Sequence, residues 1–293
     1  MKNTDINIRD PFVLLEDGKY YLYGSRGSET WGLCTGLDVY VSDDLETFSD
    51  PIEVFTPPAD FWSDRNFWAP EVHKYEGAYY MLATFYAKDK MRGTQILKAD
   101  SPLGPFKLHS EGPVTPADWM CLDGTLHIEN GTPYMVFCHE WVQVHDGEMC
   151  VIELSNDLTK AVGEPKVLFT ASSLPGVCEV GYAPGQNVDA KGNYVTDGPF
   201  MYRTKSGRLL MIWSSFTKEG YCEAISYSDN GSVLGNWAHE EKLLFSKDGG
   251  HGMLFYDKEG NLKFPYHQPN NPKGAERPHF ADVEEKNDTL VAK

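Results

Sequence analysis

Cysteine pairs, positive charge and long apolar runs are all scarce in this sequence of 293 residues. The six cysteines are scattered and none lies in a Cys-x-x-Cys pair, so neither a zinc site nor a redox pair is indicated and buried free thiols are expected. No stretch approaches the roughly 20 apolar residues of a membrane span, and the first residues lack the apolar core of a signal peptide. We therefore expect no membrane partner. A full-length chain would be cytoplasmic, although a secreted or periplasmic protein whose signal peptide had been removed would look the same.

The charge is strongly one-sided. Asp and Glu number 43 against 26 Lys and Arg, which gives a formal net charge of -17 at pH 7. Such a chain repels polyanions, so nucleic acid is not expected as a partner. A hydrophobic content of 41% is enough to bury a substantial core. We expect one domain over residues 1–293.

Convincing amphipathic helices are also missing, and a different pattern recurs instead. A glycine followed by a short aromatic and β-branched run, which predicts a buried strand, occurs five times. The glycines that begin these runs are Gly18, Gly77, Gly131, Gly207 and Gly260. Each run is followed by a further strand and a polar turn, and the units repeat at intervals of roughly 50 to 75 residues. The sequence therefore predicts an all-β fold, a five-bladed β-propeller, rather than a β-sandwich or a β-helix.

One conspicuous polar residue precedes each glycine-led run. These residues are Asp10, Glu71, Asp123, Asp197 and His251. The first strand of every propeller blade lines the central channel, so we expect these side chains to converge on the axis. Clustered carboxylates repel one another, and at least one should have a raised pKa and stay protonated near neutrality. A protonated acid facing an ionised base is what cleavage of a glycosidic bond requires.

Asp197 has a second interpretation. In Asp197-Gly198-Pro199 it could simply be the first residue of a tight turn. Its distance in sequence from the following glycine-led run is interpreted as the one that Asp10 and Asp123 share. This favours a carboxyl that faces the channel.

The ordered motifs around these residues resemble those of glycoside hydrolase family 43, from residue 5 to residue 285. The motifs are Arg9-Asp10-Pro11, Trp68-Ala69-Pro70-Glu71, Leu122-Asp123-Gly124, Asp197-Gly198-Pro199 and Gly250-His251-Gly252. Sucrose and fructan hydrolases of a related five-bladed family should carry a Trp-Met-Asn-Asp-Pro-Asn-Gly segment, which is absent. A mannoside phosphorylase would need basic residues for phosphate, whereas this channel is acidic.

The resemblance implies hydrolysis with inversion, in one displacement. Asp10 would match the general base and Asp123 the carboxylate that tunes and orients the acid. Asp197 would match the general acid, where the family usually has a glutamate that is one methylene longer. Glu179 and Glu140 are the alternative proton donors.

His251 resembles the histidine that helps to hold a calcium ion on the propeller axis in many members of this family. Calcium prefers oxygen ligands, so a single histidine among waters would be an unusual site. The alternative is a neutral histidine that forms hydrogen bonds in the channel.

Tryptophans near the motifs are candidates for sugar binding, because sugar rings stack their apolar faces on aromatic side chains. The predicted substrate-binding residues are Trp31, Trp68, Glu71, Trp141 and Arg277. Arg277 could instead pair with an acidic neighbour, and Trp213 and Trp237 are expected to pack inside the blades. The segment from Leu174 to Thr196 is the longest insertion, and we expect it to form one wall of the pocket.

The resemblance suggests an exo-acting enzyme that releases a neutral pentose or furanose from polysaccharide side chains, oligosaccharides or small glycosides. In the order of expected substrates, α-L-arabinofuranosides rank first, β-D-xylosides second, and galactofuranosides or galactosides third. We expect a closed pocket for a single sugar. The competing hypothesis is a glycan-binding propeller without catalysis, which has no need of carboxylates at like offsets in four units.

Overall fold

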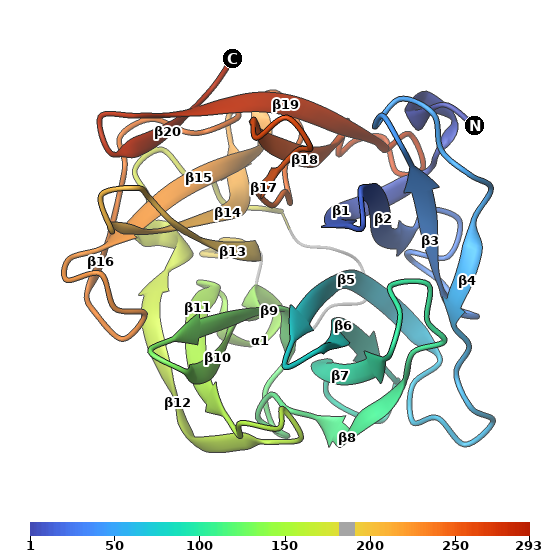
Figure 1. The fold of residues 1–293 in the computed structure, drawn as a ribbon. Helices are drawn as coiled ribbons and strands as arrows, with labels where there is room; N and C mark the ends of the chain where they lie inside the picture. The colour runs from blue at the N-terminus through green and yellow to red at the C-terminus, as the bar shows by residue number, and fades with distance from the viewer. Residues whose placement is uncertain (182–190) are drawn as a thin grey trace.

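The computed structural model describes residues 1–181 and 191–293, which form five antiparallel sheets of four strands each around a common axis (Figure 1). Each sheet is built from four strands that are consecutive in the sequence. The predicted five-bladed β-propeller is therefore confirmed.

The blades follow one another in chain order. The first comprises β1 (Ile8–Glu16), β2 (Lys19–Arg26), β3 (Leu37–Ser42) and β4 (Ile52–Phe55). The second comprises β5 (Arg65–Tyr75), β6 (Ala78–Tyr86), β7 (Gly93–Ala99) and β8 (Lys107–Pro113). The third comprises β9 (Cys121–Glu129), β10 (Thr132–His139), β11 (Glu148–Leu154) and β12 (Ala161–Thr170).

The last two blades have the same plan. The fourth comprises β13 (Asp197–Arg203), β14 (Leu209–Thr217), β15 (Gly220–Ser228) and β16 (Trp237–His239). The fifth comprises β17 (Phe255–Tyr256), β18 (Leu262–Gln268), β19 (Arg277–Lys286) and β20 (Thr289–Ala292). Three short helical turns are η1 (Asn3–Asp5), α1 (Trp141–Val144) and η2 (Ala171–Ser173).

The recurrent glycines are explained by the turns between first and second strands. In the first blade Asp17 and Gly18 both have positive φ values, 49° and 72°, and in the third blade Asn130 and Gly131 have 52° and 84°. A two-residue turn with two positive φ values matches the twist of the strands on either side, and glycine adopts it without a steric penalty. The strand that follows each such turn is largely buried.

The core lies between neighbouring blades. Trp213 on β14 is fully buried, and its indole nitrogen donates to Ser226 Oγ at 2.7 Å. Trp237 on β16 is half-buried, and its indole nitrogen donates to the backbone oxygen of Val233 at 3.1 Å. Trp213 belongs to an apolar cluster shared by the third and fourth blades, and Trp237 packs against it, so both tryptophans are packing residues, as expected.

The ring closes without a strand shared between its ends. All four strands of the fifth blade come from residues 255–292. The first and fifth blades are joined instead by polar side chains: Asn7 Nδ2 donates to the backbone oxygen of Glu276 at 2.8 Å, and Arg9 pairs with the Glu276 carboxylate at 2.8 Å. Arg277 donates through Nε to the backbone oxygen of Thr4 at 2.9 Å.

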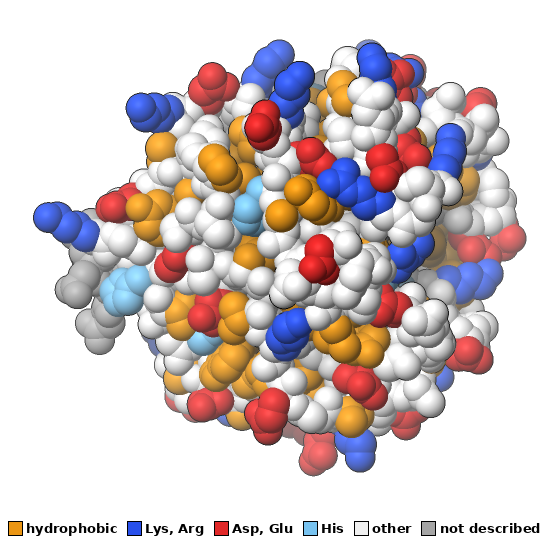
Figure 2. All heavy atoms as spheres, turned by 90° about the vertical axis from the view of Figure 1, so that its left-hand side faces the viewer, with side chains coloured by type: hydrophobic (Ala, Val, Ile, Leu, Met, Phe, Trp, Pro, Cys, Tyr) orange, Lys and Arg blue, Asp and Glu red, His pale blue; other side chains and the backbone are white. Residues whose placement is uncertain are grey.

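The surface and the cysteines agree with the composition. Figure 2 shows acidic and basic side chains interspersed with small groups of hydrophobic ones on the side of the molecule that it presents. The six cysteines, all within the described residues, are free, and Cys121, Cys138, Cys150 and Cys222 are buried. Within residues 1–181 and 191–293, no helix has the length and apolar character needed to cross a membrane.

Candidate active site

The innermost segment of every blade has a residue with a positive φ at the same place, next to a break in the strand pairing. These bulge residues are Asp10 (56°), Ala69 (44°), Asp123 (58°), Gly198 (50°) and His251 (50°). Each follows a residue that pairs with the end of the second strand of its blade, as Arg9 pairs with Ser25 and Leu122 with Cys138. A bulge of this kind re-aims side chains, here at the start of the strand that lines the channel.

This equivalence corrects two of the positions taken from the sequence. Glu71 lies two residues after Ala69, the bulge residue of the second blade, and its Oε2 lies 2.9 Å from His73 Nε2. Asp197 lies one residue before Gly198, so its backbone position corresponds to that of Arg9 and not to that of Asp10. The polar residues alone do not reveal the bulges, which shift the register by one or two residues.

A side chain of the preceding blade accepts the N–H group of each bulge residue. Four of these bonds are Ala69 to Ser25 Oγ (2.9 Å), Asp123 to Thr84 Oγ1 (2.9 Å), His251 to Ser214 Oγ (2.7 Å) and Asp10 to His267 Nδ1 (3.2 Å). Each of these four acceptors lies on the second strand of its own blade. There it pairs with the residue that directly precedes the bulge residue of that blade. The segments that carry the candidate catalytic residues are thus tied to one another around the ring.

The three aspartates expected to be catalytic line one small cavity. The cavity has a volume of about 60 Å³, more than the roughly 15 Å³ that one water needs. Asp10, Asp123 and Asp197 share its wall with His251, Trp31 and Trp68, and Arg9, Thr30 and Leu122 complete it. Six residues predicted from the sequence therefore converge at one place.

Asp10 is a buried carboxylate surrounded by donors. Ser25 Oγ donates to its Oδ2 at 2.5 Å, and His251 Nδ1 lies 3.2 Å from its Oδ1. Burial alone would raise the pKa of Asp10, but the positive charges of His251 and Arg9 outweigh it, and the pKa lies below its ordinary value. Asp10 is therefore ionised at neutral pH.

Asp123 and Asp197 have pKa shifts in the opposite direction. Burial raises the pKa of Asp123, and the charges of Asp197 and Asp10 raise it further against the opposing effect of His251. Burial also raises the pKa of Asp197, although His251 and a hydrogen bond from Tyr221 act against it. The Tyr221 hydroxyl donates to Asp197 Oδ2 at 2.9 Å. The cavity thus holds one ionised carboxylate opposite two that retain protons more readily.

The two alternative proton donors lie outside the wall of this cavity. Glu140 is buried and forms an ion pair with Arg92. Burial and the charge of Asp197 raise the pKa of Glu140, while Arg92 opposes the shift. Glu179 accepts an exposed hydrogen bond of 3.3 Å from the Tyr194 hydroxyl.

The predicted substrate-binding residues divide into two groups. Trp31 and Trp68 line the cavity with their rings in edge-to-face contact, 5.4 Å between centroids, and Trp31 is 51% exposed. Glu71, Trp141 and Arg277 are not among the residues that line it: Trp141 begins α1, and Arg277 joins the fifth blade to the N-terminal segment. The predicted pocket wall from Leu174 to Thr196 includes residues 182–190, which lie outside the described residues.

The surroundings of His251 do not form a cage of protein ligands for calcium. In the part of the chain that the structure describes, no group of three or more His, Cys, Asp or Glu side chains is arranged to hold a metal ion. Burial alone would lower the pKa of His251, but Asp10 and Asp123 outweigh it and raise the pKa to about 9. His251 therefore faces the carboxylates as a charged partner.

Arg9 and Tyr221 are site residues that the sequence analysis missed. Arg9 was visible inside the Arg9-Asp10-Pro11 motif, and it lines the cavity one position before Asp10. Tyr221 lies on β15, and Asp197 lies two strands away on β13. The Tyr221 hydroxyl reaches Asp197 across the intervening strand β14. A local sequence pattern could have indicated Arg9, whereas Tyr221 depends on the register of the sheet.

Comparison with known proteins agrees with this architecture. The model of glycosyl hydrolases family 43 matches residues 5–283. An endo-arabinase from Bacteroides thetaiotaomicron VPI-5482 is 39% identical, with 98% of each chain covered and a TM-score of 0.89. An endo-1,4-beta-xylanase from the same organism is 22% identical and has a TM-score of 0.75, with 100% of this chain and 96% of that chain covered, which shows a shared fold.

A curated relative matches over a shorter region. Xylosidase/arabinosidase 43A of Humicola insolens is 26% identical over 153 residues, which span 47% of this chain and 45% of that protein. The family match, in contrast, extends over nearly the whole chain and includes all five motifs. The chain belongs to glycosyl hydrolases family 43 and is a glycoside hydrolase.

Proposed function

We propose that this enzyme hydrolyses α-L-arabinofuranosidic bonds with inversion of configuration, using Asp10 as the general base and Asp197 as the general acid. The observation that carries the proposal is the convergence of Asp10, Asp123 and Asp197 on one cavity in a chain of this family. Their opposite pKa directions support a division into one base and one acid.

Asp10 is suited to activate water. Its negative charge is stabilised by Ser25, His251 and Arg9, so it is ionised before substrate binds. The cavity volume of about 60 Å³ beside it leaves room for a water molecule. In an inverting reaction this water attacks the anomeric carbon from the face opposite the leaving group and transfers its proton to Asp10.

Asp197 is suited to protonate the leaving oxygen. Its raised pKa keeps a proton available, and Tyr221 fixes the orientation of its carboxyl group. Asp123 accepts a hydrogen bond from the backbone of Gly198 at 3.0 Å and so holds the segment that carries Asp197. We assign Asp123 to positioning the acid and, as the family resemblance implies, to tuning its pKa.

The choice of sugar rests on similarity and on the cavity wall. The endo-arabinase that is 39% identical to this chain supports an arabinofuranosyl substrate, and the tryptophan pair Trp31 and Trp68 supports stacking of a neutral sugar ring. β-D-Xylosides rank second. Release of single sugars from chain ends stays a prediction, as does calcium at His251, which loss of activity on chelation and recovery with calcium would support.

The test is a screen of arabinan, arabino-oligosaccharides, xylo-oligosaccharides and the corresponding aryl glycosides, with the anomer of the first product followed by proton NMR. We expect turnover of arabinofuranosides and initial release of the inverted anomer. Initial release of the retained anomer would rule out the assigned roles. Saccharide binding without turnover of any substrate would favour the glycan-binding propeller, and the length of the products separates attack at chain ends from attack inside the chain.

A further inference from the structure

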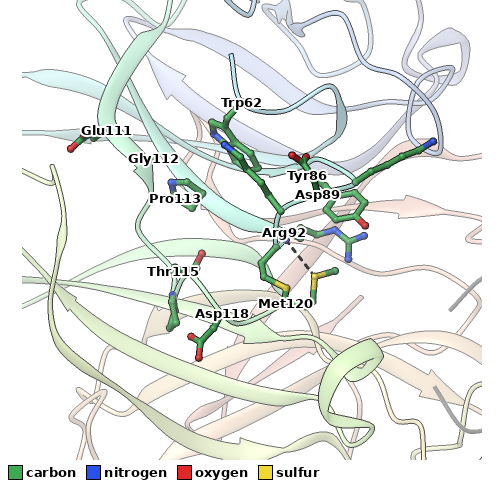
Figure 3. Close-up of a pocket in the computed structure, with 15 residues that line it drawn as sticks. Trp62, Tyr86, Asp89, Arg92, Glu111, Gly112, Pro113, Thr115, Asp118 and Met120 are labelled. Atoms are coloured by element: carbon green, nitrogen blue, oxygen red, sulfur yellow. Dashed lines mark hydrogen bonds between the residues drawn. The ribbon is translucent and has the colours of Figure 1, made fainter. Parts of the chain in front are cut away.

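A second cavity, much larger than the first, lies beside the second blade, at its connections to the first and third blades. It has a volume of about 1050 Å³. Its walls are Tyr86 at the end of β6, residues 88–92 before β7, residues 111–113, 115–118 and 120 from the end of β8 toward β9, and Trp62 from the connection between β4 and β5 (Figure 3). We call it the interblade groove. The end of β6 pairs with the start of β5, as Tyr86 pairs with Arg65, so the groove opens at the same end of the blades as the bulges.

Arg92 connects the groove to the catalytic cavity. Its side chain lines the groove, and its guanidinium carbon lies 4.6 Å from the ring centroid of Trp68, which lines the catalytic cavity. Arg92 is held in place by its ion pair with Glu140 and by a hydrogen bond to Asn66 Oδ1 at 3.2 Å. The groove therefore begins beside the residues around the predicted cleavage site.

Trp62 is a half-buried indole in a fixed orientation on the groove wall. Its Nε1 donates to Gln95 Oε1 at 2.6 Å, and the buried Gln95 amide in turn donates to the backbone oxygen of Ser110 at 2.9 Å. Phe61 and Phe85 pack against it with ring centroids at 5.9 and 6.4 Å. The indole N–H is already bonded inside the protein, and Lys90 Nζ lies over the ring at 5.9 Å from its centroid. Trp62 therefore offers a ligand the apolar surface that its neighbours leave uncovered, and a sugar ring stacks on such a surface.

The charge on the groove wall is balanced, although the whole chain is strongly acidic. The lining includes three basic side chains, Lys88, Lys90 and Arg92, and three acidic ones, Asp89, Glu111 and Asp118. A balanced wall favours a neutral ligand over a polyanion or a polycation. Its volume is at the upper end of the roughly 300 to 1,000 Å³ typical of ligand pockets, so several sugar units could be accommodated.

From these observations we infer that the interblade groove binds neutral sugar units of the substrate that lie several units away from the cleaved bond, with Trp62 as the stacking platform. This inference rests on the proposed function of the catalytic cavity. It adds a distal binding site and predicts that long oligosaccharides are better substrates than short ones.

The test compares long and short arabino-oligosaccharides on the wild-type enzyme and on Trp62→Ala and Trp62→Phe. We expect Trp62→Ala to lower the ratio of kcat/KM for the long substrate to that for the short one by about 5- to 10-fold, and Trp62→Phe to restore most of it. Trp237→Ala is the matched control, because Trp237 is also half-buried with a bonded indole N–H but lies on β16. It is expected to leave the ratio unchanged.

An unchanged ratio in Trp62→Ala, with its fold verified by the melting temperature, would overturn the inference, and so would equal losses on both substrates. If the wild-type enzyme cleaves neither saccharide, the proposed function fails separately. In that case calorimetric titration with the long oligosaccharide still tests the groove. Equal affinity of the wild type and Trp62→Ala, or no binding to either, would overturn it.

Discussion

The carboxylate of Asp123 accepts a hydrogen bond of 3.0 Å from the backbone N–H of Gly198, the residue directly after Asp197. In the other four blades the corresponding acceptor is a serine, threonine or histidine side chain on the second strand. In the third blade the equivalent second-strand residue is Cys138, a weak acceptor. Asp123 therefore supplies the contact that its own blade would otherwise lack, and it links the third blade to the candidate acid.

Replacing Asp123 separates its hydrogen bond from its charge. Asp123→Asn keeps an oxygen that can accept from Gly198, whereas Asp123→Ala removes the acceptor and leaves a buried N–H unpaired. We expect kcat/KM to fall about ten-fold further in Asp123→Ala than in Asp123→Asn, as one hydrogen bond implies. Steady-state kinetics on arabino-oligosaccharides measure the difference. Equal losses in the two variants would show that the acidic group matters and the bond to Gly198 does not.

Asp197→Asn tests the general acid. Natural saccharides have poor leaving groups and need a proton, whereas an activated aryl glycoside leaves without one. We expect a loss of about 10²- to 10⁴-fold on the natural substrate, the range for general acid catalysis, and a much smaller loss on the aryl glycoside. Parallel measurements of kcat/KM on both substrates check this. Glu140→Gln, which changes the alternative donor, is expected to lower kcat/KM on both substrates by the same factor. A selective loss on the natural substrate in Glu140→Gln, with equal losses in Asp197→Asn, would assign the acid to Glu140.

The length of the acid side chain gives a separate prediction. Tyr221 and the backbone at Gly198 hold Asp197 in a position set for an aspartate. Asp197→Glu keeps the proton but moves it by about one bond length, so we expect a loss of roughly 10- to 100-fold on the natural substrate. An Asp197→Glu enzyme as active as the wild type would show that the site tolerates either acid.

The pH profile depends on Asp10 and Asp197. Activity requires Asp10 ionised and Asp197 protonated, so it should fall on the acid side as the pH drops through the lowered pKa of Asp10. On the alkaline side it should fall as the pH rises through the raised pKa of Asp197. The Tyr221 hydroxyl stabilises ionised Asp197, so Tyr221→Phe raises the pKa of Asp197 further. The alkaline limb of kcat/KM should therefore move to higher pH by about one unit.

Tyr202→Phe is the control for this shift. The Tyr202 hydroxyl is within hydrogen-bond distance of the Tyr256 hydroxyl, at 2.8 Å, away from the cavity. Its removal should leave both limbs of the profile in place. Movement of the alkaline limb to lower pH in Tyr221→Phe would contradict the assignment of that limb to Asp197.

The fold was predictable because its signal is local and repeated. The turn glycines recur in every blade, and three of them, Gly18, Gly77 and Gly131, directly precede a buried second strand. The site was predictable only in part, because polar character was used as a substitute for backbone position. The true bulge residues lie eight or nine residues before the turn glycine in all five blades, and this regular spacing places Ala69 and Gly198 at the bulges. Glu71 and Asp197 have the conspicuous charge but lie two residues after and one residue before these bulge residues.

Other features could not be predicted from spacing. The bond from Tyr221 to Asp197 joins the third strand of a blade to the first, and it depends on the twist and register of the sheet between them. The interblade groove is lined by the second blade, by its connection to the third blade and by Trp62 from its connection to the first. Such contacts arise from packing in three dimensions and leave no periodic trace in the sequence.

Glu276 holds the ends of the ring together, and its replacement should destabilise the whole propeller. Its side chain is only 1% exposed, and it accepts from Arg9 Nη1 at 2.8 Å and from the backbone N–H of Gly274 at 2.6 Å. Removing one partner of a buried ion pair leaves the other charge uncompensated. We therefore expect Glu276→Ala to lower the free energy of unfolding in urea by about 3 to 5 kcal/mol. Asp43→Ala breaks the exposed pair with Lys19 and should have a much smaller effect. Because no strand is shared between the described ends of the ring, equal effects of the two variants would mean that closure depends on apolar packing between the first and fifth blades rather than on Glu276.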